Sequence, residues 1–206
     1  FAEAEPGTPV LDENPDWTSS ETYYYHGALS LCLAHRPVQD WAVEQAVNLI
    51  DDYGVDWILQ DGENMVKLCT KTTHSHDARN SNYAGAAGLD EVLQRIREAR
   101  PAVLWENCED GGNMMTFKMV GNYVTSITND ASGAFESREA VYGATYPFPP
   151  RYADRYMIEE TLTPYVTRSH MFGGPWIFMN RLPELEPEQF DLAQSEVALF
   201  KSIRGL

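Results

Sequence analysis

The stretch that decides the fold reads Val55-Asp56-Trp57-Ile58-Leu59-Gln60-Asp61-Gly62. The apolar run is short and rich in β-branched and aromatic residues, which favours a buried strand over a helix. It stops at Asp61, and a carboxylate at the end of a buried strand is costly unless something uses it. Parallel α/β proteins place their chemistry at the carboxyl ends of strands, so Asp61 is the first candidate site residue. For this strand taken alone, an aspartate that caps the next turn remains the simpler interpretation.

The residues around this strand alternate between strand and helix. A strand is predicted at 29–33, and apolar residues at steps of three and four predict a helix from Pro37 to Gly54. Together with 55–61 they form a strand–helix–strand unit with short connections, which is typical of a parallel sheet. The pattern predicts further strands at 102–105, 123–127 and 173–179, further helices around 89–96, 135–142 and 190–200, and loops at 1–22, 62–83 and 146–152.

Composition excludes several classes of function. The net charge of -16 over 206 residues argues against nucleic acid and anionic membranes as partners. A hydrophobic content of 43% supports a folded core, and no apolar run is long enough to span a bilayer. The first 15 residues are acidic and proline-rich, unlike a signal peptide. Three cysteines are too few for a disulfide framework, so we expect a reducing, cytoplasmic location.

Three predicted strands end in polar residues. Asp61 follows the first, Cys108 and its neighbours follow the second, and Asp130 follows the third. Such strand ends suggest one shared site on the rim of a barrel. Asp61 and Asp130 are candidates for the two carboxylates of glycoside hydrolysis, which retaining enzymes hold about 5–5.5 Å apart. An N-cap for the helix that follows is the other interpretation of Asp130.

The remaining reactive residues give weaker signals. Cys108 beside Gly111-Gly112 resembles a nucleophile on a turn, but no histidine lies near it in sequence; a glycine turn that lets a ligand approach the backbone fits better. His74 and His76 form a weak His-x-His motif, which leaves open a metal-dependent hydrolase that also uses Asp61. No cysteine pair has zinc-type spacing, and we predict neither metal nor cofactor.

Several segments, taken in order along the chain, resemble the motifs of a known family. The most specific is Trp105-Glu106-Asn107-Cys108-Glu109-Asp110-Gly111-Gly112, followed by Thr125–Asp130. The others are Asn14–Trp17, Leu29–Trp41, Ile58–Asp61, Tyr142-Gly143, Met171–Gly173 and Leu199–Arg204. In order and approximate spacing they resemble glycoside hydrolase family 36, the melibiase-like α-galactosidases, whose motifs include I-K-W-D, F-E-S-C-A-S-G-G and W-T-S-D.

The resemblance implies an α/β fold in which residues 1–206 form strands four to eight of a (β/α)8 barrel. The family's N-terminal β-sandwich and C-terminal β-domain, and the rest of the barrel, are then expected outside this chain. The implied reaction is retaining double displacement on an α-galactoside, with Asp61 as nucleophile and Asp130 as acid/base. Cys108, Gly111 and Gly112 are expected beside the sugar hydroxyls.

Four residues differ from the family pattern at positions expected to bind substrate. Leu59 and Gln60 replace lysine and tryptophan, His26 replaces arginine, and Asn129 replaces serine. Since polar sugar sites discriminate through paired hydrogen bonds, these changes bear on sugar specificity more than on hydrolysis. A catalytically lapsed or altered-specificity carbohydrate-binding barrel is therefore the alternative function. A carbohydrate partner is expected under both hypotheses, and assembly into a homo-oligomer is left open.

Overall fold

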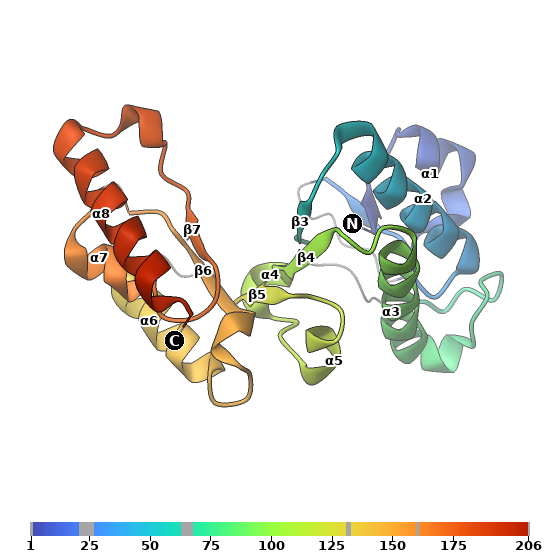
Figure 1. Cartoon of the computed structure of the whole chain (residues 1–206). Helices are drawn as coiled ribbons and strands as arrows, with labels where there is room; N and C mark the ends of the chain where they lie inside the picture. The colour runs from blue at the N-terminus through green and yellow to red at the C-terminus, as the bar shows by residue number, and fades with distance from the viewer. Residues whose placement is uncertain (1, 21–26, 63–67, 131–132, 160, 206) are drawn as a thin grey trace. The chain divides into compact units, whose positions relative to one another are not determined.

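The computed structural model describes residues 2–20, 27–62, 68–130, 133–159 and 161–205. They form two compact units, Phe1–Trp105 and Glu106–Leu206, which we describe separately (Figure 1). Within the described residues, five strands are hydrogen-bonded in chain order, β3-β4-β5-β6-β7. Strand β4 (Leu104–Asn107) runs across the boundary between the two units.

The first unit combines a small antiparallel sheet, two long helices and the start of the larger sheet. Its elements are β1 (Glu3–Ala4), α1 (Pro9–Glu13), η1 (Pro15–Trp17), β2 (Leu29–Ser30), α2 (Arg36–Tyr53), β3 (Trp57–Gln60), η2 (Ala78–Asn80) and α3 (Ser81–Ala99). Helices α2 and α3 pack side by side (Figure 1). The Leu104 N–H donates to the Asp56 carbonyl at 2.9 Å and joins β4 to the start of β3.

Helices α2 and α3 confirm the predicted periodicity. In α2 the apolar face, Val38, Ala42, Ala46 and Ile50, is buried. The helix ends at Gly54, whose φ of 63° is left-handed and whose N–H donates to the Ile50 carbonyl. Glycine adopts this conformation without the steric cost of a Cβ, which explains the stop. Helix α3 likewise buries Leu89, Val92, Leu93 and Ile96.

The second unit is a set of parallel strands connected by helices. Its elements after β4 are α4 (Glu109–Gly112), α5 (Phe117–Val120), β5 (Thr125–Ile127), α6 (Ala134–Ala144), η3 (Pro150–Tyr152), β6 (Ala153–Met157), α7 (Pro164–Ser169), β7 (Trp176–Phe178), η4 (Leu182–Glu184) and α8 (Pro187–Ile203). The pairs β4–β5, β5–β6 and β6–β7 are all parallel. This confirms an α/β parallel sheet, as a portion of a (β/α)8 barrel requires. None of the described helices has the length and apolar character needed to cross a membrane.

The N-terminal prediction was wrong in two respects. Residues 1–22 are not a plain loop, because they contain β1, α1 and η1. The strand at 29–33 is shorter than predicted and lies outside the five-stranded sheet: β2 pairs antiparallel with β1, with Ser30 opposite Glu3. An apolar run indicates a strand but does not specify its partner, and here the preceding segment supplies one.

Two further strands differ from the prediction. Strand β3 forms, but it is not fully buried: Trp57 and Leu59 are 39% and 45% exposed. It stands first in the strand order of the described sheet, so one of its edges has no neighbouring strand among the described residues. Strand β6 was missed, because Asp154-Arg155-Tyr156 breaks the apolar pattern that identifies a strand.

Candidate active site

Asp61 directly follows β3 and is exposed. Its Oδ1 accepts a hydrogen bond from the Gly62 N–H at 2.8 Å, a local contact that orients the carboxylate. With Leu59, Gln60 and Trp105 the side chain lines a cavity of about 390 Å³ within the first unit. The carboxylate predicted at the strand end is therefore accessible to a ligand.

Asp130 lies three residues after β5 in the second unit, and it is also exposed. The Tyr156 hydroxyl, from β6, donates to Asp130 Oδ1 at 3.3 Å. Helix α6 begins at Ala134 with Gly133 as its N-cap, so the interpretation of Asp130 as an N-cap is wrong. Its carboxylate is held from the neighbouring strand and not by the helix that follows.

Gly111 and Gly112 let the segment after β4 pack against the end of β5. Their φ angles are +61° and +84°, which favour glycine. A Cβ on Gly111 would lie 2.5 Å from the Asp130 carboxylate, and a Cβ on Gly112 would lie 2.5 Å from the Ile127 carbonyl oxygen. Gly111 thus leaves room for the Asp130 carboxylate and Gly112 for the backbone at the end of β5. Contact of the two glycines with a sugar stays a prediction.

The other predicted substrate-binding residues fall into different environments. Gln60 and Cys108 are buried, and Leu59 is exposed. Asn129 is half-buried, and its Oδ1 has no hydrogen-bond partner within the described part of the chain. His26 lies outside the described residues. The structure brings together Gly111, Gly112, Asn129 and Asp130 around the ends of β4 and β5, while Leu59, Gln60 and Asp61 are consecutive at the end of β3.

Two buried carboxylates of the second unit lie on β4 and β6, the strands on either side of β5. Glu106 in β4 and Asp154 in β6 are 2% and 1% exposed. Thr125 in β5 donates to Asp154 Oδ2 at 2.6 Å. Burial first, and then the Glu106 carboxylate, raises the pKa of Asp154 to about 8, against the lowering effects of Thr125 and Arg155. Asp154 is therefore protonated at neutral pH.

This proton makes stability depend on pH. The folded-state pKa of Asp154 is above its unfolded value of 3.8, so folding retains a proton and stability falls as pH rises from about 4 to about 8. We expect Asp154→Asn to remove that dependence. Its free energy of unfolding should improve relative to wild type by roughly 1 kcal/mol per pH unit over this window.

The measurement is denaturant unfolding of the complete protein that contains these residues, at several pH values between about 5 and 8. Asp191→Asn is the matched control, because Asp191 is exposed on α8 and should leave the pH dependence unchanged. If the free energy of unfolding falls equally with rising pH in wild type and in Asp154→Asn, the assignment of this proton to Asp154 is wrong.

Strand β6 supplies the site residues that sequence reasoning missed. Besides Asp154, it contributes Tyr156, which contacts Asp130, and the buried Arg155, whose guanidinium lies 3.9 Å from the centre of the Tyr156 ring. One signal was available in the sequence. The stretch between 128 and 173 is longer than a single strand–helix connection needs, which indicates an additional strand.

The histidines considered as metal ligands lie elsewhere. His74 and His76 group with Cys32 and Cys69 in the first unit, and Asp61 is not a member of that group. The hypothesis of a metal-dependent hydrolase built on His74, His76 and Asp61 therefore has no geometric support among the described residues.

Comparison with known families decides where the chain belongs. The Melibiase family model matches residues 4–159, which is more than half of the chain. The chain belongs to the Melibiase family. It is 24% identical over 206 residues to alpha-galactosidase 2 of Pediococcus pentosaceus, covering 93% of this chain and 27% of that protein. It is 21% identical over 149 residues to alpha-galactosidase C of Emericella nidulans, covering 70% and 19%.

Solved structures share the fold of this chain. The GH36 alpha-galactosidase AgaA of Geobacillus stearothermophilus superimposes with a TM-score of 0.88 at 17% identity, covering 98% of this chain and 30% of AgaA. The alpha-galactosidase of Lactobacillus brevis gives 0.87 at 18% identity, covering 98% and 29%. The chain spans between 19% and 27% of the length of the curated relatives it matches.

Proposed function

We propose that the protein containing this chain hydrolyses α-galactosides or related α-glycosides with retention of configuration. The observation that carries the proposal is the placement of two exposed aspartates in a chain of the Melibiase family, with Asp61 directly after β3 and Asp130 three residues after β5. Glycoside hydrolysis needs two carboxylates and no cofactor. The relatives' description as alpha-galactosidases supports this class of substrate.

In the proposed reaction Asp61 is the nucleophile and Asp130 the acid/base. The Asp61 carboxylate attacks the anomeric carbon, while the Asp130 carboxylic acid donates its proton to the departing glycosidic oxygen. Asp130 then removes a proton from water, which attacks the anomeric carbon and releases Asp61. Two inversions at that carbon give overall retention. The Tyr156 hydroxyl orients Asp130 during both steps.

Sugar complexes of a similar structure support a carbohydrate as the substrate. AgaA has been crystallised with raffinose after one of its aspartates was replaced by asparagine, and with stachyose after another was replaced by alanine.

Substrate contacts are proposed for the residues around the two aspartates. Cys108, Gly111, Gly112 and Asn129, all in the second unit, are proposed to contact the sugar. Asn129 Oδ1 is an acceptor without a partner within the described residues. Gln60 and Leu59, which precede Asp61 in the first unit, are also proposed to contact the sugar. Because Leu59 has no donor for a sugar hydroxyl, we expect a tolerance for α-glycosides other than galactosides.

Gly111 gives a prediction about the position of Asp130. A Cβ at residue 111 would lie 2.5 Å from the Asp130 carboxylate, so Gly111→Ala should displace that group. We expect kcat to fall by about 10- to 100-fold, because small misplacements of catalytic groups are costly. Gly143→Ala, where a Cβ meets nothing within 4 Å, is the matched control and should retain activity. Equal activity of both variants would show that Asp130 does not depend on Gly111.

A sugar-binding protein without turnover is the second candidate. It is favoured by Leu59, an exposed apolar residue at the position where family members have lysine. The remaining barrel strands, the family's flanking β-domains and any self-association stay proposals about the complete protein. A cytoplasmic location is likewise proposed, on the strength of three buried, free cysteines.

The test uses the complete protein and a panel of aryl α-glycosides that includes the α-galactoside. Nuclear magnetic resonance follows the first anomer of the released sugar before it mutarotates. We expect turnover of at least one α-glycoside, with the α-anomer released first. Release of the β-anomer would contradict the double displacement. Sugar binding by calorimetry with no turnover of any glycoside would favour the second candidate.

A further inference from the structure

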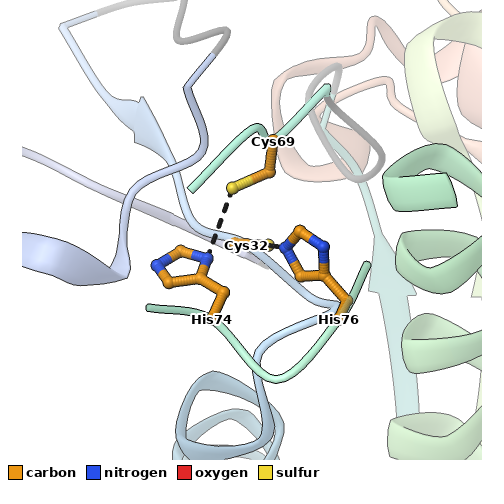
Figure 2. A group of neighbouring side chains, drawn as sticks. All are labelled: Cys32, Cys69, His74 and His76. Carbon is orange, nitrogen blue, oxygen red and sulfur yellow. Dashed lines mark hydrogen bonds between the residues drawn. The ribbon is translucent and has the colours of Figure 1, made fainter. Parts of the chain in front are cut away.

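A cluster of two cysteines and two histidines lies in the first unit, and the proposed hydrolysis does not use it. Cys32 follows β2, whereas Cys69, His74 and His76 lie in the segment that precedes η2 (Figure 2). Cys32, Cys69 and His74 are buried, and His76 is half-buried. The four residues come together from parts of the chain more than thirty positions apart, which is why spacing alone did not reveal them.

The four ligand atoms of the cluster lie near the spacing that tetrahedral coordination needs. One nitrogen or sulfur atom from each residue lies within 4.8 Å of the others. Cys32 Sγ is 3.4 Å from His76 Nε2, and Cys69 Sγ is 3.3 Å from His74 Nδ1. Zinc bonds of about 2.3 Å to sulfur and 2.0–2.1 Å to nitrogen place neighbouring ligand atoms roughly 3.3–3.8 Å apart in a tetrahedron. Modest inward movement of the farther atoms completes such a site.

The His74 ring is held with its lone pair facing the cluster. Its Nε2 lies 2.7 Å from the Asp16 carbonyl oxygen, which can only accept, so Nε2 carries the hydrogen. In the neutral ring Nδ1 then has the lone pair, and Nδ1 is the atom that faces Cys69. Burial, as the main effect, lowers the pKa of His74 and favours this neutral form. A histidine whose other nitrogen donates to a carbonyl is the usual outer-shell arrangement at metal sites.

Contacts behind the cluster fix these groups in place. Asp16 is bound through its carboxylate by Thr73 at 2.7 Å and by Lys71 at 3.3 Å. The His35 ring stacks on His74 with centroids 4.3 Å apart and an interplanar angle of 19°. The residues between Leu68 and Asp77 form no helix or strand, so side-chain contacts hold this segment.

The donor set selects one class of ligand. Thiolates and imidazoles prefer Zn²⁺ over Mg²⁺ or Ca²⁺, which take oxygen ligands. Two thiolates also cancel the charge of a divalent cation, so the complex can be buried without a net charge. Without a cation, burial and the neighbouring Cys69 raise the pKa of Cys32 to about 12, so its thiol keeps its proton.

We propose that Cys32, Cys69, His74 and His76 bind one Zn²⁺ as a closed, structural site. Two zinc–sulfur and two zinc–nitrogen bonds form, the two thiol protons leave to solvent, and no atom is oxidised or reduced. The metal joins the segment after β2 to the segment before η2, and it stabilises a part of the chain that has no backbone ladder of its own. The inference is independent of the proposed hydrolysis.

The first experiment measures metal content in the complete protein, purified without a histidine tag. We expect about one zinc ion per chain in wild type and in Cys108→Ser, whose cysteine is buried outside the cluster. Cys69→Ser and His76→Ala should each lose most of the zinc. Two variants are used in case one of them does not fold. Circular dichroism shows whether each variant is folded.

The second experiment titrates the reduced, metal-free protein with Co²⁺. Tetrahedral coordination by two sulfurs and two nitrogens gives intense visible bands and sulfur-to-cobalt charge transfer, which Zn²⁺ should abolish by displacement. Removal of zinc should lower the melting temperature by about 5 °C or more. The inference is overturned if zinc is absent and Co²⁺ gives no such spectrum, or if mass spectrometry of the native protein finds Cys32 and Cys69 joined in a disulfide.

Discussion

Asp61→Gly is expected to lower the turnover of an aryl α-galactoside, or of the best α-glycoside found, by at least about 10³-fold in the complete protein. Without its carboxylate the enzyme cannot form the covalent intermediate, and direct attack by water is slow. The shorter side chain leaves space beside the anomeric carbon. Added azide should therefore restore part of the turnover and give a β-glycosyl azide, which is detectable by chromatography.

Asp56→Asn is the matched control for Asp61. Asp56 is exposed at the other end of the same strand, and its contribution to β4 is made by its backbone carbonyl, which asparagine keeps. We expect its turnover within about two-fold of wild type, as for an ordinary surface change. Unchanged turnover in Asp61→Gly would remove Asp61 from the mechanism and with it the proposed double displacement.

Asp130→Asn is expected to show an effect that depends on the leaving group. For a poor leaving group, such as a natural sugar, kcat/KM should fall by about 10²–10⁴-fold, the usual contribution of general acid catalysis. For an activated aryl leaving group that needs no proton, kcat/KM should change little. The asparagine can still accept the Tyr156 hydrogen bond, so the change isolates proton transfer from packing.

Rates measured across a series of aryl glycosides separate this outcome from simple damage. Glu139→Gln, an exposed carboxylate on α6, is the control and should follow the wild-type series. A uniform loss of activity for all leaving groups in Asp130→Asn would show that Asp130 is not the general acid. Asp130 would then contribute only to substrate binding or to the structure of the site.

Much of the fold was predictable because local patterns decided it. The helical face from Val38 to Ile50 and the glycine stop at Gly54 are both present in α2. The strands predicted at 55–61, 102–105 and 123–127 correspond to β3, β4 and β5 of one sheet, with β4 shifted to Leu104–Asn107. Each of these signals depends on neighbours in sequence: apolar spacing, a left-handed glycine, or a short apolar run.

Features that depend on tertiary contacts were not predictable in the same way. The pairing of β2 with β1, rather than with the larger sheet, follows from where the N-terminal segment lies. Strand β6 carries Asp154 and Arg155 in the interior, where Thr125 donates to Asp154 and the Arg155 guanidinium lies over the Tyr156 ring.

The candidate site shows the same division. Asp61 and Asp130 were identified from strand ends and family resemblance, and both are exposed where those strands stop. Tyr156, which holds Asp130, comes from the strand that was missed. The cluster of Cys32, Cys69, His74 and His76 has no recognisable spacing, because its members are gathered by folding.

Trapping the covalent intermediate tests the central claim most directly. A fluorinated α-galactosyl donor with a good leaving group slows hydrolysis of the glycosyl-enzyme, so the intermediate accumulates and survives proteolysis. We predict that mass spectrometry of the complete protein will find a single fluorosugar on the peptide that contains Asp61, attached to that residue as an ester. A label on another carboxylate, or sustained turnover of the donor with the β-anomer released and no label, would contradict the account.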